Sequence, residues 1–152
     1  AEARQDLQAA IAQKKKGTGF LIEREGRLGG ILKQCIHDGF GLQRFKEKLS
    51  GPEYAERFIE EFHSLEIPAK LGRLFKDPES DQDFQVWTVS RNGVEMLVSR
   101  TLILATGCRE RTAKQVSNSR NKTGGVYTAG TAQHFTNLQG VMPADEVCDS
   151  GK

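Results

Sequence analysis

The chain has 152 residues, which is the length of one domain with its own core, although 37% hydrophobic content is low for a compact α/β fold and 28% charge is slightly high. Its 22 basic and 20 acidic residues give a net charge of +2 and are spread along the sequence, which argues against a nucleic-acid-binding surface with clustered basic residues. The 3 cysteines form no C-x-x-C pair and no apolar run approaches the ~20 residues of a membrane span, so we expect no metal site, no membrane span and a reducing, cytoplasmic setting.

The first elements predicted along the chain are a helix and a strand. Residues 6–16 show helical spacing of apolar side chains, with Asp6 as the N-cap and Gly17 as the stop. Residues 18–23 then predict a strand, and residues 24–30 a glycine-containing loop. This order is typical of the start of an α/β fold.

A second helix is the clearest element of the sequence. It begins at Pro52, and one face is apolar while the other is charged. The apolar stripe consists of Tyr54, Phe58, Ile59, Phe62 and Leu65. Residues 31–49, which precede this helix, show no readable pattern, and residues 69–75, which follow it, predict a strand.

The following region predicts a β-hairpin that leads into a buried strand. Residues 83–90 and 94–99 flank Asn92-Gly93, which is a strong hairpin signal. Residues 101–105 form a short apolar run that ends abruptly at a threonine and a glycine. Such a run is typical of a buried parallel strand that brings backbone to a ligand at its carboxyl end.

The last part of the chain predicts one short helix. Residues 108–124 are polar and irregular, and residues 131–138 predict a helix that stops at Gly140. The whole order of elements suits an α/β nucleotide-binding layer with an antiparallel meander as the crossover. We therefore predict an α/β fold.

Two acids follow the strand at residues 18–23. Glu23 could accept hydrogen bonds from both ribose hydroxyls of an adenosine, as an acid at the carboxyl end of a second strand does. The same residue could be an ordinary loop acid, and Glu25 is an equally good candidate by charge. From spacing alone, these interpretations remain open.

Two glycine-containing stretches could let backbone approach a ligand. Gly29-Gly30 would do so because glycine has no Cβ, although a plain turn explains the pair as well. Thr106-Gly107 follows the same logic at the end of the predicted buried strand. The apolar run before it makes this the stronger candidate.

The other candidate residues have simpler explanations. Cys35 and His37 could form a thiolate–imidazole pair, or they could be a small buried thiol beside a histidine in a turn. His63 lies on the polar shoulder of the second helix, and His134 has no obvious acidic partner. No catalytic triad or pair of catalytic carboxylates stands out, so no catalytic residue is assigned.

Several stretches together resemble a known family. The first motif combines residues 21–25 and 27–41, the second is residues 103–111 and the third is residues 125–133. Together they resemble the FAD-binding half of flavoproteins with two dinucleotide-binding domains. The class is that of the pyridine nucleotide–disulfide oxidoreductases, including NAD(P)/FAD-dependent enzymes related to systems that oxidise glycerol 3-phosphate, opines and sarcosine. Three separated motifs in the right order make the resemblance specific over residues 7–147.

The resemblance implies a partial Rossmann-like FAD-binding domain over residues 1–127, with a β-meander over residues 66–100. Residues 128–152 would be the hinge segment that leads to an NAD(P) domain absent from this chain. The cofactor-binding residues implied are Glu23 at the adenosine ribose, Gly29 and Gly30 near the flavin side, and Ala105, Thr106 and Gly107 beneath the FAD.

The resemblance also implies an activity. The parent enzyme would transfer electrons between NAD(P)H or a small organic substrate and the flavin. The redox C-x-x-C of thioredoxin reductases is absent, because Thr128-Ala129-Gly130-Thr131 stands near its place. Cys35 stands alone where the glutathione reductase branch has two cysteines. Oxidation of a small-molecule substrate is therefore favoured over disulfide reduction.

The family's glycine motif is missing at the start of the chain. Ala1, Ala3 and Asp6 stand at its three glycine positions, and an acid at a helix N-terminus disfavours a pyrophosphate. We expect a fragment in which FAD binding is weak or absent. The alternative is a non-catalytic interaction module that retains the scaffold without cofactor, as a homo-oligomer or beside a complementing chain.

Overall fold

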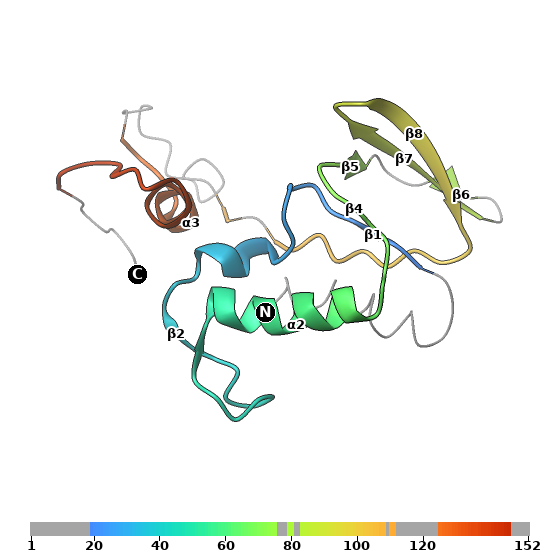
Figure 1. Ribbon diagram of the computed structural model, residues 1–152. Helices are drawn as coiled ribbons and strands as arrows, with labels where there is room; N and C mark the ends of the chain where they lie inside the picture. The colour runs from blue at the N-terminus through green and yellow to red at the C-terminus, as the bar shows by residue number, and fades with distance from the viewer. Residues whose placement is uncertain (1–18, 76–78, 81–82, 109, 112–124, 147–152) are drawn as a thin grey trace.

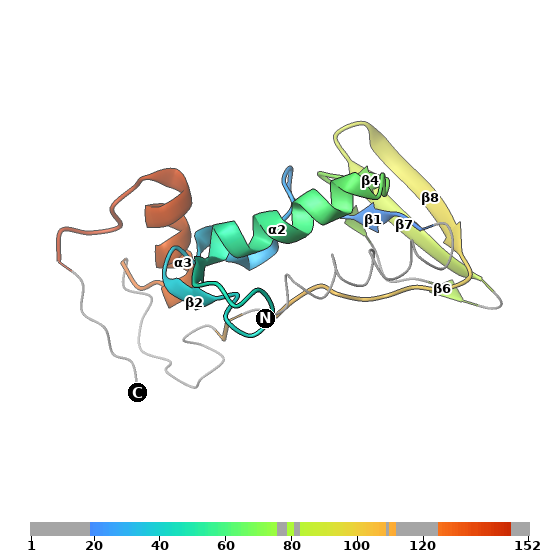
Figure 2. The ribbon, with the colours of Figure 1, turned by 60° about the horizontal axis from the view of Figure 1, so that its bottom comes forward.

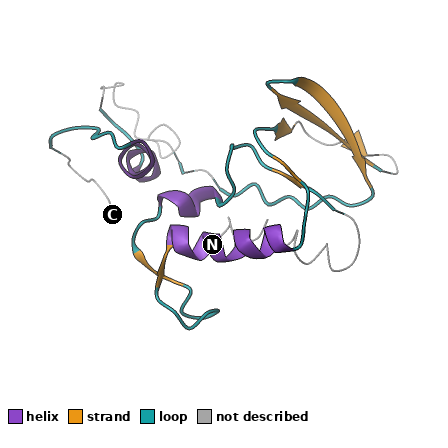
Figure 3. Ribbon diagram, in the orientation of Figure 1, coloured by secondary structure: helices purple, strands orange, loops and turns teal. Residues whose placement is uncertain are grey.

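The computed structural model describes residues 19–75, 79–80, 83–108, 110–111 and 125–146 (Figure 1). Figure 3 distinguishes its helices from its strands. The elements, in chain order, are β1 (Leu21–Ile22), the 3-10 helix η1 (Gly30–Gln34), β2 (Asp38–Phe40), β3 (Leu49–Ser50), α2 (Gly51–Ser64), β4 (Ala69–Lys70), β5 (Leu74–Phe75), β6 (Glu79–Ser80), β7 (Phe84–Ser90), β8 (Gly93–Ser99), α3 (Ala129–Gln133) and the π-helix η2 (His134–Leu138). The helix predicted over residues 6–16 lies outside the described residues.

Helix α2 confirms the clearest prediction from the sequence. The Glu53 carboxylate accepts hydrogen bonds from the backbone N–H of Ser50 at 2.8 Å and from its Oγ at 2.7 Å, which ties the start of the helix to the preceding residue. These bonds hold the pKa of Glu53 below its ordinary value. Pro52 lies in the first turn, where its missing N–H costs nothing.

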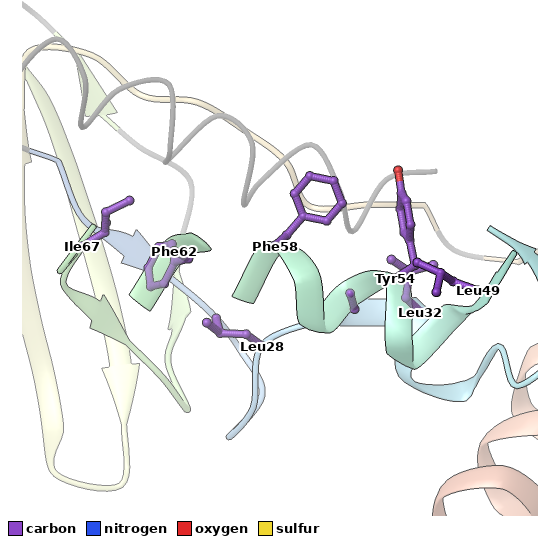
Figure 4. Close-up of a cluster of buried hydrophobic side chains, with 8 residues drawn as sticks. Leu28, Leu32, Leu49, Tyr54, Phe58, Phe62 and Ile67 are labelled. Carbon is purple, nitrogen blue, oxygen red and sulfur yellow. The ribbon is translucent and has the colours of Figure 1, made fainter. Parts of the chain in front are cut away.

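The apolar face of α2 forms the core of the molecule. Phe58 and Phe62 are almost completely buried, and Tyr54 packs edge-on against Phe58 with ring centroids 5.2 Å apart. Figure 4 shows these rings along the helix, with side chains from η1 and the neighbouring segments around them. The buried cluster consists of Leu28, Leu32, Leu49, Tyr54, Ala55, Phe58, Phe62 and Ile67. The core therefore lies between α2 and the segments just before and after it.

The backbone of η1 approaches the start of α2 closely. The N–H of Gly51 donates to the carbonyl of Cys35 at 2.8 Å. A Cβ at Gly51 would lie 2.5 Å from that carbonyl oxygen and 2.6 Å from the carbonyl oxygen of Leu32. Only glycine fits at this position without a backbone shift.

The strand predicted over residues 69–75 is divided in two. β4 pairs in parallel with β1, whereas β5 pairs antiparallel with β7. Gly72 lies between them with φ at +65°, and its N–H donates to the carbonyl of Glu25 at 3.0 Å. The prediction of one continuous strand was wrong because the chain turns at this glycine.

The predicted hairpin is confirmed, with Gly93 as the first residue of its second strand. β7 and β8 pair antiparallel over their full length, from Phe84 opposite Ser99 to Ser90 opposite Gly93. β5 and β6 also pair with β7, so β7 is the central strand of a four-stranded meander. Figures 1 and 2 show this meander beyond one end of α2 and α3 beyond the other.

A charged cluster fixes the meander to the β4 segment. Lys70 Nζ donates to Glu95 Oε1 at 2.6 Å, and Arg73 donates to the other carboxylate oxygen of Glu95. Arg73 also reaches the buried Thr88 hydroxyl at 3.3 Å. The bond from Lys70 and the two positive charges lower the pKa of Glu95.

The buried strand predicted over residues 101–105 is not present. The segment contains no regular secondary structure, and Ile103 and Leu104 are 58% and 63% exposed. Figure 1 shows it running from the end of β8 back toward η1 and α3. Within the described residues no strand pairs with this segment, because the parallel sheet consists only of β1 and β4. Without neighbouring strands an apolar run stays exposed.

The predicted helix over residues 131–138 is confirmed as the consecutive helices α3 and η2, which start two residues earlier. Gln34 of η1 donates to the carbonyl of Gly130 at 3.0 Å, and Asn137 donates back to the carbonyl of Gln34 at 2.7 Å. Glu110 accepts from the N–H of Gly130 at 2.9 Å. These bonds dock the helices on η1. Every helix in the described ranges is too short or too polar to cross a lipid bilayer.

Candidate cofactor groove

A groove of about 1700 Å³ runs along the molecule between the meander and α3. Its walls come from β1 and the loop after it, η1, β4 and β5, the segment at 97–108, and α3 with η2. Small-ligand pockets are usually about 300–1,000 Å³, so this is an extended groove rather than a closed pocket. It could accommodate a long ligand.

Glu23 lies in the groove wall at the carboxyl end of β1. Its backbone N–H donates to the carbonyl of Lys70 at 3.1 Å, and its carbonyl accepts from the N–H of Arg73 at 2.9 Å. Its Oε1 accepts from the N–H of Glu25 at 2.8 Å. The parallel ladder therefore holds the residue in place. Among the described residues, its second carboxylate oxygen has no hydrogen-bond partner in the structure and remains available to a ligand.

Glu25 also lines the groove but is neutralised by a lysine. Lys33 Nζ donates to the Glu25 carboxylate and also to the carbonyl of Arg27 at 3.0 Å. The hydrogen bond from Lys33 is the main cause that lowers the pKa of Glu25, and the charges of Lys33, Arg24 and His134 act in the same direction. The structure thus separates two acids that the sequence could not distinguish: Glu25 forms an ion pair with Lys33, whereas Glu23 has no ion-pair partner among the described residues.

The two adjacent glycines have different surroundings. Gly30 lines the groove, with φ at +50°. Gly29 is not part of the lining: it is buried, and a Cβ there would lie 3.2 Å from Lys33 Cγ and 3.5 Å from the Ala55 side chain. Its φ of +108° is one that glycine adopts without strain. Gly29 therefore shapes the turn into η1, while Gly30 faces the groove.

The predicted second motif also lies in the groove. Ala105, Thr106 and Gly107 all belong to its lining, although they are in a segment without regular secondary structure rather than at the end of a buried strand. Five of the six predicted cofactor residues therefore line one groove: Glu23, Gly30, Ala105, Thr106 and Gly107. They come from three separate parts of the chain.

Two groove residues were not anticipated from the sequence. Lys33 lies in a region without readable periodicity, and its side chain is only 19% exposed beside Glu25. His134 lines the groove from the other end of the chain, and its charge acts on Glu25. The acidic partner that His134 lacks in the sequence is brought near by the docking of η2 on η1. No local sequence signal could have indicated this.

Cys35 and His37 make separate contacts. The half-buried Cys35 thiol donates to the carbonyl of Ile31 at 3.4 Å. His37 is exposed, with Nδ1 3.2 Å from the carbonyl of Asp38 and its ring 5.2 Å from that of Phe40. The contacts resolved for them favour a thiol bonded to its own turn over a thiolate–imidazole pair. Across the described ranges, no group of three or more His, Cys, Asp or Glu side chains could hold a metal ion.

Two solved structures share this fold. L-proline dehydrogenase from P. horikoshii matches 94% of the chain with a TM-score of 0.75 at 19% identity. Bacillithiol disulfide reductase from Bacillus cereus matches 62% of the chain with a TM-score of 0.53 at 20% identity. The chain spans only 28% of the length of the first and 34% of the second. No protein-family model and no curated protein matches the sequence.

Both neighbours are oxidoreductases by name, and one of them is a disulfide reductase. At these identities the similarity concerns the fold. The predicted α/β fold with an antiparallel meander is confirmed, and the resemblance to the oxidoreductase class is confirmed at the level of fold.

Proposed function

We propose that this chain is the FAD-binding half of an oxidoreductase that transfers electrons between NAD(P)H or a small organic substrate and a flavin. One observation supports it above the others. The residues that the resemblance assigns to the adenosine ribose, to the flavin side and to the underside of an FAD molecule line the same groove, although they lie up to about eighty residues apart in the chain. They are Glu23, Gly30, and Ala105, Thr106 and Gly107.

The described residues fit the adenosine part of FAD. Glu23 is held by the β1–β4 ladder, and one of its carboxylate oxygens is unengaged among the described residues. A ribose hydroxyl donates to a carboxylate in a charge-assisted bond, which is roughly twice as strong as a neutral one. Residues 105–107, of which Thr106 and Gly107 are exposed, line the same groove. When bound, the flavin would accept and donate the electrons, and the chain's residues would orient the cofactor.

The expected affinity of the chain alone is low. The sequence places Asp6 at the N-terminus of the helix that would face the pyrophosphate, and its negative charge would oppose binding. That helix lies outside the described residues. The nicotinamide would bind to the separate domain expected beyond residues 128–152. Substrate and NAD(P) are therefore properties that we propose for the parent enzyme.

The test is a comparison of two flavins by equilibrium dialysis at millimolar ligand. FAD contains the adenosine ribose that Glu23 would bind, whereas FMN does not. We expect the chain to bind FAD more tightly than FMN. Glu23→Gln should weaken FAD binding by about 10- to 100-fold, the loss of a hydrogen bond to a charged group, and leave FMN binding unchanged.

Glu60→Gln is the matched control, because Glu60 is exposed on α2 and lies outside the groove lining. It should leave both affinities unchanged. Equal affinity for FAD and FMN, an unaltered FAD affinity in Glu23→Gln, or no flavin binding by the wild-type chain would each contradict the proposal.

The alternative function is a non-catalytic interaction module. It is favoured by one observation: the apolar segment at 101–105 and much of the meander surface are exposed in the isolated chain. Exposed apolar patches of this kind mark protein interfaces. Self-association without any flavin binding would support this alternative over the enzyme.

A further inference from the structure

The meander has one strand edge that no other described strand covers. β8 pairs with β7 through all seven residues, and within the described ranges its other edge has no partner strand. Figure 2 shows β8 at the margin of the sheet. An open edge presents unpaired backbone N–H and C=O groups to any approaching strand.

The side chains of β8 divide cleanly between the two faces of the sheet. Glu95 and Leu97 share the inner face with the buried Val86 and Thr88 to which the strand register pairs them. The outer side chains of the strand are all apolar. They are Val94, Met96 and Val98, with exposures of 66%, 44% and 56%.

The edge lacks most of the usual features that prevent pairing, and its one inward-pointing charge is paired within the chain. β8 has no proline, and its register with β7 runs without a bulge. The single charge on the strand, Glu95, is held toward the body of the protein by Lys70 and Arg73. An incoming strand therefore meets no charged side chain on the outer face of β8.

The hydrogen-bonding pattern fixes which backbone groups lie on this edge. A two-residue loop, residues 91–92, joins Ser90 to Gly93, and such loops close on a hydrogen-bonded pair. Hydrogen-bonded and non-hydrogen-bonded pairs alternate along an antiparallel ladder. Counted from the Ser90–Gly93 pair, the backbone N–H and C=O groups that point toward β7 are those of Gly93, Glu95, Leu97 and Ser99. The N–H and C=O groups of the three apolar outer residues then point to the open edge.

We propose that this edge binds a second copy of the chain, with the two β8 strands antiparallel and the two-fold axis at Met96. In this register Met96 lies opposite Met96 of the second copy, and Val94 lies opposite Val98. Because the two-fold axis repeats the Val94–Val98 pair, the interface has three pairs of residues, and all of them are apolar. Each pair can form about two backbone hydrogen bonds between the strands, because the N–H and C=O groups of these residues point to the open edge.

Charge selects the same register. With the axis at Met96, Glu95 lies opposite Leu97 of the second copy. Moving the axis by one residue to Glu95 would place two carboxylates directly opposite and would also put the wrong set of backbone groups at the interface. The strand is thus self-complementary in one register over all seven residues, which is why a second copy is its natural partner.

Sedimentation equilibrium of the full chain over a range of concentrations tests this proposal. The wild type should form a reversible dimer. Val94→Lys with Val98→Lys should be monomeric, because lysines would oppose each other at both ends of the interface. Val94→Lys with Val98→Glu should dimerise at least as well as the wild type, because each introduced lysine would then face an introduced glutamate.

The two double variants alter the same exposed positions, so each controls for the other, and circular dichroism checks that both fold. A wild type that is monomeric at all concentrations would overturn the proposal. Equal self-association of the two double variants would also overturn it, because the difference between them depends on the register.

A crosslink provides a second, independent readout. Met96→Cys should form an intermolecular disulfide under mild oxidation, because Cα atoms in a hydrogen-bonded pair are about 5.5 Å apart and disulfides span about 4.4–6.8 Å. Gln85→Cys is the control, because Gln85 lies on β7, opposite Val98 and on the same face of the sheet. It is one strand further from the proposed interface, so the two introduced cysteines of a dimer would be too far apart to form a disulfide. Equal crosslinking yields from the two variants would contradict the proposed axis.

Discussion

Two apolar stretches of this chain, the face of α2 and the segment at 101–105, look equally suited to burial in the sequence but have opposite environments. Phe58 and Phe62 on α2 are 1% and 0% exposed, whereas Ile103 and Leu104 are 58% and 63% exposed. The helix satisfies its own backbone hydrogen bonds and needs only a cover for one face, which η1 and its neighbours give. A buried parallel strand needs flanking strands as well, and the described sheet has none for this segment.

The largest expected effect comes from opening a cavity in the α2 core. Phe62→Ala should lower the free energy of unfolding by about 3–5 kcal/mol, because a fully buried ring is removed from a packed site. Leu104→Ala is the matched change in the exposed segment, and it should alter the free energy by no more than about 0.5 kcal/mol. Urea unfolding of both variants measures the difference. Similar losses would mean that the two stretches are packed alike.

A smaller effect is expected at the contact between η1 and α2. Gly51→Ala should destabilise by about 1–3 kcal/mol, because the added methyl would meet the carbonyl oxygens of Cys35 and Leu32. At Gly26 a Cβ would meet nothing within 4 Å. Gly26→Ala should therefore leave stability unchanged or raise it by up to about 1 kcal/mol. A loss at Gly26 as large as that at Gly51 would contradict the close packing of η1 on α2.

The smallest expected effect is the acid dependence of the α2 cap. The bonds from Ser50 hold the folded-state pKa of Glu53 below its ordinary value of 4.5, so ionised Glu53 stabilises the fold. The contribution of Glu53 to the free energy of unfolding is complete at a pH above its ordinary pKa, and it is lost as the pH falls through the lower pKa of the folded state. The stability difference between the wild type and Glu53→Gln should therefore shrink below about pH 4.5. Glu60→Gln, which removes a carboxylate further along the same helix and leaves the cap intact, is the control variant. A difference for Glu53→Gln that stays constant down to pH 2 would exclude the capping role.

The features that the sequence predicts correctly are local ones. The stripe from Tyr54 to Phe62 specifies α2, and Asn92-Gly93 specifies the hairpin, because each needs only near neighbours in the chain. The resemblance placed Glu23 and Thr106 in one site, and both line the groove. The pairing of Lys33 with Glu25 could not be predicted, because it depends on how the loop after β1 turns into η1. The approach of His134 could not be predicted either, because it depends on how η2 docks on η1. The error at residues 101–105 has another cause, because a buried strand depends on flanking strands that the described sheet does not provide.

Hydrogen exchange in the presence and absence of FAD tests the central claim, that the groove between β1 and the segment at 105–107 is the cofactor site. Saturating FAD should slow exchange at the backbone amides of residues 21–25 and 103–107 together. The amides of α2, a helix that contributes no residue to the groove lining, should be unaffected. Protection confined to another region, or protection of only one of the two groove segments, would contradict the account.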